Sequence, residues 1–465
     1  MTRESWNTRV GFILAAVGSA VGLGNIWRFP WMTADNGGSA FLVVYLLIVV
    51  FVGVPGLLGV LVIGRRSKRN PVGALESLSG SRRWGYVGLF AVLTSMFLLT
   101  FYSVVGGWTL RYTVESLSGA YFADPAAYFT AVSFGPPAVA YHVVFLGLTA
   151  AIVFAGVRDG IELATKLMIP AIVVLLGGLA AWAMSLDGAA AGLDFYLSFD
   201  LAYLRANFID VLGAAAGQAL FTLSVGAGTM ITYASYISED RSLPFDGMSI
   251  AVLNTTVGFI AGLVVFPLLF TLGVDPGSGG AGAVFISLAG GFARLPFGEG
   301  IALVFFGVLA LAALSSSISM LEVPVSYLVD EHEITRRQAT GSLFAIFLVT
   351  GSVSAMRPAI FGFIADTLVD LMLTAGLLGF LLFAGWVLGR DAIAEFEMGA
   401  GTIGRAVSRP WLSAIAVVLP LFLGFTLISG ILGAVGITVE AILVLAVTAL
   451  LGGATFIGLK RPDSA

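Results

Sequence analysis

The chain has 465 residues, of which 58% are hydrophobic and only 11% are charged, and its formal net charge is −4 at pH 7. A soluble protein carries about 25% charged residues, so the composition excludes a soluble domain and indicates a polytopic membrane protein. There are no cysteines, which excludes disulfides and thiol chemistry. The lipid bilayer is therefore the expected environment, and no nucleic-acid partner is expected.

Twelve apolar segments are long enough to cross a bilayer, which takes about 20 residues. They cover residues 9–33, 38–63, 84–117, 138–157, 163–185, 207–237, 245–273, 299–329, 339–356, 360–388, 411–431 and 437–458. If the N-terminus is cytoplasmic, only five of the 23 basic residues lie outside, namely Arg28, Arg111, Arg205, Arg294 and Arg357. The positive-inside rule then predicts a multi-pass cell-membrane protein with both termini in the cytoplasm.

The first span is interrupted by small and polar residues. Residues 18–30 read GSAVGLGNIWRFP, with Gly18, Gly22, Gly24 and Asn25 where a membrane helix would continue with Leu and Val. Each Gly costs about 1 kcal/mol relative to Ala in a helix, and open backbone at membrane depth is tolerated only where it lines a cavity or is buried in protein. This stretch either opens the helix to bind a ligand or forms a close-packing face of small residues.

The sixth span carries a second interruption at residues 217–229, GQALFTLSVGAGT. Two interrupted spans that lie five spans apart predict a transporter built from inverted five-helix repeats, with the site between its broken helices. We expect a transporter core over residues 1–390, with repeats at about 9–185 and 207–388. Residues 391–465 then hold two additional spans and a short cytoplasmic C-terminus.

Few polar groups lie at membrane depth, and such groups are functional candidates by default. They are Ser19, Asn25, Tyr102, Gln218, Thr222, Ser224, Asn254, Ser315 and Ser316. Amide, hydroxyl and carbonyl oxygens suit hard cations, and half-helix N-termini suit a carboxylate. No nucleophile–base pair is available at depth, so we do not expect an enzyme. Glu322 is the only acid well inside a core span, and we expect it to serve packing or a hydrogen bond.

These motifs resemble the neurotransmitter:sodium symporter family, with the LeuT fold. The resemblance rests on residues 18–30, 36–38 (NGG), 217–228, 233–236 (YASY) and 315–319 (SSSIS), and it covers about residues 3–390. It implies an all-α membrane protein with 12 transmembrane helices, an inverted repeat of helices 1–5 and 6–10, and broken helices 1 and 6. It also implies a prokaryotic sodium:amino-acid symporter that works by alternating access, and it leaves a homodimer open.

The resemblance implies two sodium sites. The first would use the Ala20 carbonyl, Asn25, Thr222, Asn254 and the substrate carboxylate. The second would use the carbonyls of Gly18, Val21 and Ala312 with Ser315 and Ser316. Substrate would contact Ser19, Gly22, Gly24, Leu98, Tyr102, Phe221, Thr222, Ser224, Ala227, Ser316 and Met320.

The resemblance also implies gates on both sides. Arg28 would pair with Asp366 or Asp370 at the exterior, under a lid formed by Phe221 and Tyr102. The cytoplasmic gate would comprise Arg3, Trp6, Tyr236 and Asp330. Gly160 and Pro170 match the spaced pair that lets helix 5 unwind.

The sequence departs from the family at Gly258, where relatives have either a carboxylate or a chloride-binding Ser. Glycine supplies neither, so chloride dependence and proton counter-transport both stay open. Gly22 stands where amine transporters have Asp, which predicts a substrate that brings its own carboxylate, an amino acid. Ala227 replaces a common Phe, which predicts a hydrophobic side chain, bulky or aromatic, unless neighbours fill the space. The alternatives are proton-coupled or exchange transport on the same fold, and a non-transporting amino-acid sensor.

Overall fold

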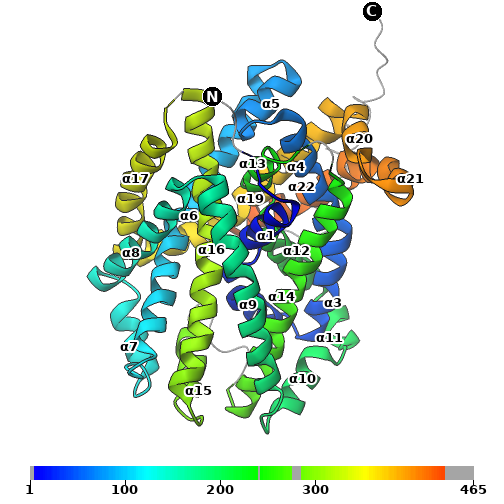
Figure 1. The fold of residues 1–465 in the computed structure, drawn as a ribbon. Helices are drawn as coiled ribbons and strands as arrows, with labels where there is room; N and C mark the ends of the chain where they lie inside the picture. Colours follow the sequence, from blue (N-terminus) through cyan, green and yellow to red (C-terminus); the bar gives the residue numbers. More distant parts are fainter. Residues whose placement is uncertain (1–4, 239–240, 275–283, 333, 435–465) are drawn as a thin grey trace, which may run out of the picture.

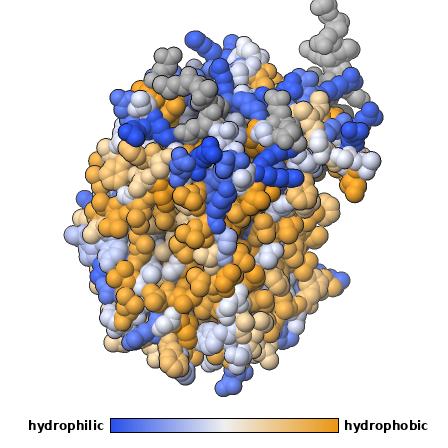
Figure 2. Space-filling view, viewed as in Figure 1, coloured by the Kyte–Doolittle hydropathy of each residue, from blue (hydrophilic) through white to orange (hydrophobic). Residues whose placement is uncertain are grey.

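The computed structural model describes residues 5–238, 241–274, 284–332 and 334–434, and these residues form a helical bundle (Figure 1). Within them, nine helices are long and apolar enough to cross a membrane, and a bent pair, Arg9–Ala20 with Gly24–Asp35, adds a tenth. Figure 2 shows a hydrophobic surface over most of the body and hydrophilic residues gathered at the end that carries α5. The all-α membrane fold predicted from the sequence is confirmed.

The first half of the chain contains five spans. Its elements are α1 (Arg9–Ala20), η1 (Gly24–Arg28), α2 (Phe29–Asp35), α3 (Ser39–Ile48), η2 (Val49–Gly53), α4 (Val54–Ser67), α5 (Pro71–Ser79), α6 (Arg82–Glu115), α7 (Pro125–Val132), α8 (Pro136–Phe154), η3 (Val157–Glu162) and α9 (Leu163–Ala183). The η elements are π-helical turns. α3, η2 and α4 together form one span, and so do η3 and α9.

The second half begins with short surface helices and then repeats the pattern of long spans. Its elements are α10 (Ala189–Leu197), α11 (Leu201–Ala206), α12 (Phe208–Thr222), α13 (Thr229–Ala234), α14 (Leu243–Thr271), η5 (Val284–Leu288), α15 (Ala289–Phe292), α16 (Gly298–His332), α17 (Arg336–Met356), α18 (Pro358–Gly362), η6 (Phe363–Leu368), α19 (Val369–Leu382), η7 (Phe383–Leu388), α20 (Arg390–Glu397), α21 (Gly401–Ser413), η8 (Ala414–Val418) and α22 (Leu419–Ala434). The sixth predicted span is α12 and α13, separated by a break. The twelfth, 437–458, lies outside the described residues, so the count of twelve stays a prediction.

Helix α1 lies inside the bundle, where it contacts α9, α14 and α16. Its start is fixed by Thr8, whose hydroxyl accepts a hydrogen bond from the N–H of Gly11. Helices α6 and α16 pack along one another. At about 1.5 Å per residue, each exceeds the roughly 30 Å hydrocarbon core, so this pair provides a rigid wall beside the broken helix.

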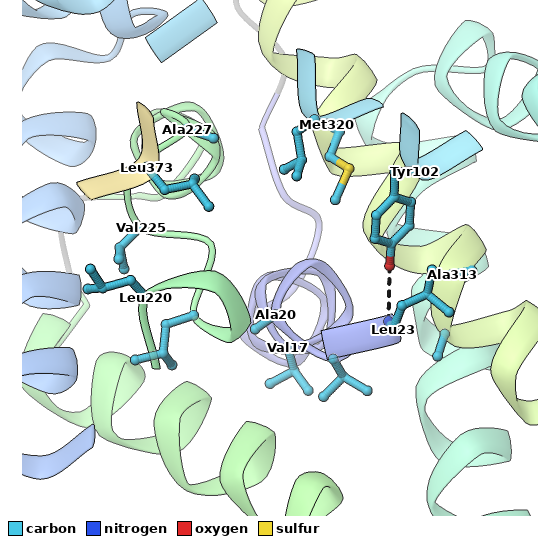
Figure 3. Packing of buried hydrophobic residues seen from close by; sticks show 14 of the residues in the cluster. Val17, Ala20, Leu23, Tyr102, Leu220, Val225, Ala227, Ala313, Met320 and Leu373 are labelled. Carbon is cyan, nitrogen blue, oxygen red and sulfur yellow. Dashed lines mark hydrogen bonds between the residues drawn. The ribbon is translucent and has the colours of Figure 1, made fainter. Parts of the chain in front are cut away.

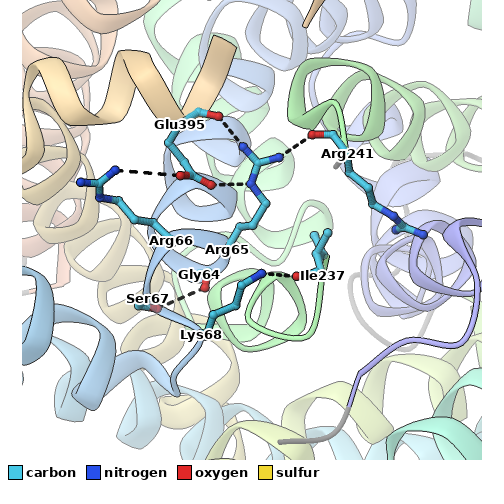
Figure 4. Close-up of polar contacts among 8 residues, drawn as sticks. All are labelled: Gly64, Arg65, Arg66, Ser67, Lys68, Ile237, Arg241 and Glu395. Atoms are coloured by element: carbon cyan, nitrogen blue, oxygen red, sulfur yellow. Dashed lines mark hydrogen bonds and ion pairs between the residues drawn. The ribbon is translucent and has the colours of Figure 1, made fainter. Parts of the chain in front are cut away.

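A buried charge ties three segments together at the hydrophilic end (Figure 4). Arg65, at the end of α4, has a side chain that is 0% exposed and pairs with the carboxylate of Glu395 on α20. The same guanidinium donates to the backbone carbonyls of Glu395 and Arg241. A neighbouring lysine, Lys68, donates to the carbonyl of Ile237. The end of α4 therefore holds both α20 and the connection between α13 and α14.

Candidate functional site

The break in helix 1 lies where the glycines predict it. Helix α1 ends at Ala20, Val21 has an extended ψ of 104°, and the chain resumes as the π-helical turn η1 with a bend of 50°. The amide of Gln218 donates to the carbonyl of Gly24 at 2.6 Å. The same carbonyl accepts from the N–H of Phe29 at the end of η1, so a side chain of helix 6 adds a second bond to the backbone beside the break. The helix is open at the glycines, and ligand binding there stays a prediction.

The break in helix 6 runs from Leu223 to Gly228, between α12 and α13. Ser224 and Gly228 have φ values of +53° and +77°, in the left-handed region that ends a helix. The hydroxyl of Ser224 donates to the carbonyl of Ser19 at 3.1 Å. The two breaks therefore meet, as Figure 3 shows for Ala20 and Leu23 on one side and Leu220, Val225 and Ala227 on the other.

One cluster of oxygen atoms joins helix 1, helix 6 and α14. The amide nitrogen of Asn25 donates to the side-chain oxygen of Asn254 at 2.9 Å and to its carbonyl at 2.8 Å. The hydroxyl of Thr222 lies 3.0 Å from Asn25 Oδ1 and 3.3 Å from Asn254 Oδ1. All three side chains are at most 1% exposed. These oxygens suit a hard cation, and Ala20, whose carbonyl the resemblance adds, ends α1 beside them.

A second oxygen cluster joins helix 1 to α16. Ser315 Oγ lies 3.2 Å from the carbonyl of Val21 and 2.9 Å from that of Ala312. Ser316 Oγ lies 3.4 Å from the carbonyl of Gly18 and 3.3 Å from that of Val21. The structure thus gathers all five residues that the resemblance assigns to a second sodium site. The oxygen atoms that could bind a cation there are again hydroxyl and carbonyl oxygens.

The groups expected around a substrate lie between these clusters. Tyr102 Oη accepts a hydrogen bond from the N–H of Leu23 at 3.0 Å (Figure 3). A Cβ atom at Gly22 would lie 2.6 Å from Tyr102 Oη and would also collide with Ser316 Oγ. The hydroxyl of Ser19 is buried and has no partner among the described residues. A side chain at position 22 would displace the hydroxyls of Tyr102 and Ser316, and a polar ligand group would find the hydroxyl of Ser19 available.

The apolar groups expected around the substrate side chain come from α6, from α16, and from α12 with the break that follows it. Leu98, Ala227 and Met320 are each at most 5% exposed. Phe221 packs beside the break in helix 1. Its ring lies so near Gly24 that a Cβ atom added there would be 2.9 Å from it. The structure therefore supplies apolar walls near the hydroxyl groups.

At the opposite end of helix 1 from the hydrophilic cap, Arg28 forms a two-point salt bridge with Asp370, at 2.7 and 3.3 Å. Its guanidinium carbon also lies 4.7 Å from the centre of the Phe221 ring. The sequence left Asp366 and Asp370 open. Asp366, one turn earlier in η6, is not part of this salt bridge, so of the two acids the structure pairs Asp370 with Arg28.

At the hydrophilic end, Trp6 packs against α13 and the turn that follows it. Its indole N–H donates to the carbonyl of Tyr233 at 2.9 Å, and its ring centre lies 6.0 Å from that of Tyr236. Asp330 accepts hydrogen bonds from the backbone and side chain of Asn70. Arg3, which the resemblance adds to this group, lies outside the described residues.

Two buried carboxylates near this end have partners that the sequence did not reveal. Glu322 accepts from Tyr236 Oη at 2.7 Å and pairs with Arg336 at 2.6 Å. Glu162 accepts from the N–H of Asn7 at 2.7 Å and pairs with Lys166 at 2.6 Å. The expectation of a hydrogen bond for Glu322 is confirmed, and its signal was a lone acid in an apolar span. Glu162 lies between two predicted spans, so no such signal marked it in the sequence.

The span made of η3 and α9, which is the helix 5 of the resemblance, combines two weak points. Gly160 lies in the π-helical turn η3, where a Cβ atom would collide with the carbonyl of Ile152, and Pro170 lies inside α9. A π-helical turn is rare and proline removes a backbone hydrogen bond. The backbone of this segment is therefore less strongly held than that of α6, which is a regular α-helix without an internal proline.

Comparison with known proteins identifies the chain. The profile of the sodium:neurotransmitter symporter family matches residues 3–123 and 135–432. The chain belongs to the sodium:neurotransmitter symporter family. It is 32% identical over 433 residues to an uncharacterized sodium-dependent transporter, YhdH, of Bacillus subtilis, covering 90% of this chain and 95% of the relative. It is 27% identical to the sodium-dependent dopamine transporter of Bos taurus, over 92% of this chain and 69% of that protein.

A solved structure agrees with this assignment. The crystal structure of MhsT in complex with L-phenylalanine matches with a TM-score of 0.82 and 36% identity, covering 92% of this chain and all of that one. This symporter therefore has the LeuT fold of a sodium-coupled membrane transporter, and it is not an enzyme.

Proposed function

We propose that this symporter couples the entry of two sodium ions to that of a hydrophobic amino acid by alternating access. The observation that carries the proposal is the meeting of two broken helices with one oxygen cluster on each side of the break in helix 1. Unwound carbonyls and half-helix ends are how transporters of this kind bind ions and carboxylates at membrane depth.

The first ion would be held by the Ala20 carbonyl and the side chains of Asn25, Thr222 and Asn254. The substrate carboxylate would complete this site, which would make ion and substrate binding interdependent. The second ion would be held by Ser315 and Ser316 with the carbonyls that they now contact. This second cluster joins the broken helix to α16, so the ion would stabilise one relative position of the two.

The substrate carboxylate would contact Tyr102 Oη and the backbone amides near Gly22. Gly22 supplies no carboxylate from the protein itself, which favours an amino acid over an amine. Leu98, Ala227 and Met320 offer no charge to a substrate side chain. The complex of MhsT with L-phenylalanine supports a bulky or aromatic hydrophobic substrate.

Arg28 with Asp370 would form the exterior gate and Trp6 with Tyr236 the cytoplasmic gate. The salt bridge between Arg28 and Asp370 and the ring contact between Trp6 and Tyr236 are both present in this structure. Unwinding of helix 5 between Gly160 and Pro170 would open the cytoplasmic route. The distribution of basic residues supports a cell-membrane protein with both termini in the cytoplasm.

The decisive experiment measures binding of labelled Trp, Leu, Ala and Glu to the purified protein in sodium, lithium and potassium, each with chloride or gluconate. We expect saturable, sodium-dependent binding of Trp or Leu and none of Glu. Uptake into proteoliposomes then separates a transporter from a sensor. Binding without sodium dependence would refute sodium coupling, equal binding of Glu would refute the apolar pocket, and uptake driven by a proton gradient in potassium would favour proton coupling. Gly258 supplies neither a carboxylate nor a hydroxyl, so the sequence leaves chloride dependence open. The comparison of binding in chloride with binding in gluconate decides it.

A further inference from the structure

We propose that α21 forms a binding site for acidic phospholipid headgroups at the cytoplasmic surface of the membrane. Its residues divide into three sectors around the helix. Gly404, Ser408 and Trp411 are buried, Ile403 and Val407 are 80% and 45% exposed, and Arg405 and Arg409 are exposed. A helix with one apolar and one basic exposed sector is the pattern of helices that lie in the membrane interface.

The buried sector fixes α21 to the transporter. The Trp411 ring stacks on Phe396 of α20 with centroids 4.5 Å apart, and its N–H donates to the carbonyl of Pro55. Ser408 Oγ donates to Glu397 at 2.6 Å. Because α20 is itself tied to Arg65 (Figure 4), the two exposed sectors of α21 are presented in a fixed orientation.

The length of this span places α21 at the membrane surface. The helix from Gly401 to Leu432 has 32 residues, or about 48 Å at about 1.5 Å per residue. The hydrocarbon core needs only about 20 residues, so roughly the first dozen extend beyond it. In Figure 1 α21 stands out from the side of the bundle at the end that carries α5 and α20, where the hydrophilic cap of Figure 2 begins.

The charges favour an anionic lipid as the occupant. No carboxylate of the described residues pairs with Arg405 or Arg409, although three acids lie on the adjoining α20. Asp391 pairs with Arg66, Glu395 pairs with Arg65, and Glu397 accepts from Ser408. The two guanidinium groups lie on roughly the opposite side of the helix from the exposed apolar strip, so the strip can face acyl chains while the arginines face the phosphates of the headgroup layer. Arginine suits this role because its planar guanidinium group can donate two hydrogen bonds to one phosphate.

The natural absence of cysteine allows a direct test in the full-length protein. A bimane label on I403C reports contact with lipid through quenching by brominated phosphatidylglycerol or brominated phosphatidylcholine in nanodiscs. L167C is the control for ordinary lipid contact, because Leu167 on α9 is 75% exposed. S77C, on the cytoplasmic helix α5, is the control for a label in water.

We expect both brominated lipids to quench the label on I403C, and phosphatidylglycerol to do so with a higher relative affinity. One basic residue contributes up to about fivefold, so two arginines give a preference of up to about 30-fold. The double variant R405Q/R409Q should reduce the preference to about one and leave quenching of L167C unchanged. The variant R82Q/R83Q, which removes two exposed arginines from the start of α6, should keep the preference.

Three results would overturn the proposal. Quenching of I403C no stronger than that of S77C would show that the apolar sector does not touch lipid. Equal affinity for the two lipids would show that the arginines do not select headgroups. A preference that survives R405Q/R409Q, or that disappears equally in R82Q/R83Q, would show only a general attraction of the cytoplasmic face.

Discussion

Removal of the hydroxyl of Tyr102 tests the centre of the proposed site. The side chain is 1% exposed, and its oxygen accepts a hydrogen bond from the N–H of Leu23 at 3.0 Å. In Tyr102→Phe this buried N–H loses its acceptor, which costs about 1–3 kcal/mol of folding free energy. The proposed bond to the substrate carboxylate is also lost, at about 1.5–3 kcal/mol of binding free energy. Since 1.4 kcal/mol is a factor of ten, the Kd for the amino acid should rise about 10- to 150-fold.

The chain offers a matched control on the same helix. Tyr112 is also fully buried in α6, but its hydroxyl has no hydrogen-bond partner among the described residues. Tyr112→Phe should therefore leave both affinity and stability close to those of the parent. The assay combines equilibrium binding of labelled amino acid at saturating sodium with thermal unfolding of the detergent-solubilised protein.

The two measurements separate the structural role from the binding role. If Tyr102→Phe lowers the Tm but leaves the Kd unchanged, the hydroxyl serves the backbone only and the proposed carboxylate contact is wrong. If both variants behave alike in both assays, the hydrogen bond to Leu23 does not stabilise the break in helix 1.

Three further predictions follow from the same geometry. Gly22→Asp should abolish amino-acid binding while circular dichroism shows an intact fold. An added Cβ would lie 2.6 Å from Tyr102 Oη and displace it, and the new carboxylate would repel that of the substrate. Retained binding would contradict the assigned position of the carboxylate. Ala227→Phe should weaken binding of Trp by at least about tenfold and binding of Ala far less, because the new ring would fill the space for the side chain of Trp. Burying an aromatic ring contributes about 1.5–3 kcal/mol. An equal loss for both ligands would argue against a side-chain pocket at this position. Arg65→Gln should destabilise the protein by about 3–5 kcal/mol, because the buried carboxylate of Glu395 then keeps only its 4.0 Å contact with Arg66. Arg66→Gln removes that longer contact and the more exposed pair with Asp391 and should cost at most about 1 kcal/mol. Similar unfolding curves for the two variants would refute the central role of Arg65 in the contacts of Figure 4.

The sequence alone determined the class of the protein and indicated where its candidate site lies. An 11% charged fraction leaves no alternative to membrane burial. Within lipid, a polar side chain or an open stretch of backbone is too costly to retain without a use. The glycines around Asn25, the interruption near Ser224 and the hydroxyls of Ser315 and Ser316 were therefore visible as anomalies before any packing was known.

Only the tertiary structure decided which of these groups meet. Asp366 and Asp370 are one turn apart and equally plausible partners by sequence, and the rotation of α19 against η1 pairs Asp370 with Arg28. The contact of Gln218 with the Gly24 carbonyl joins residues 194 positions apart. Such pairings depend on how distant helices turn and approach one another, and the composition and periodicity of a single span carry no record of either.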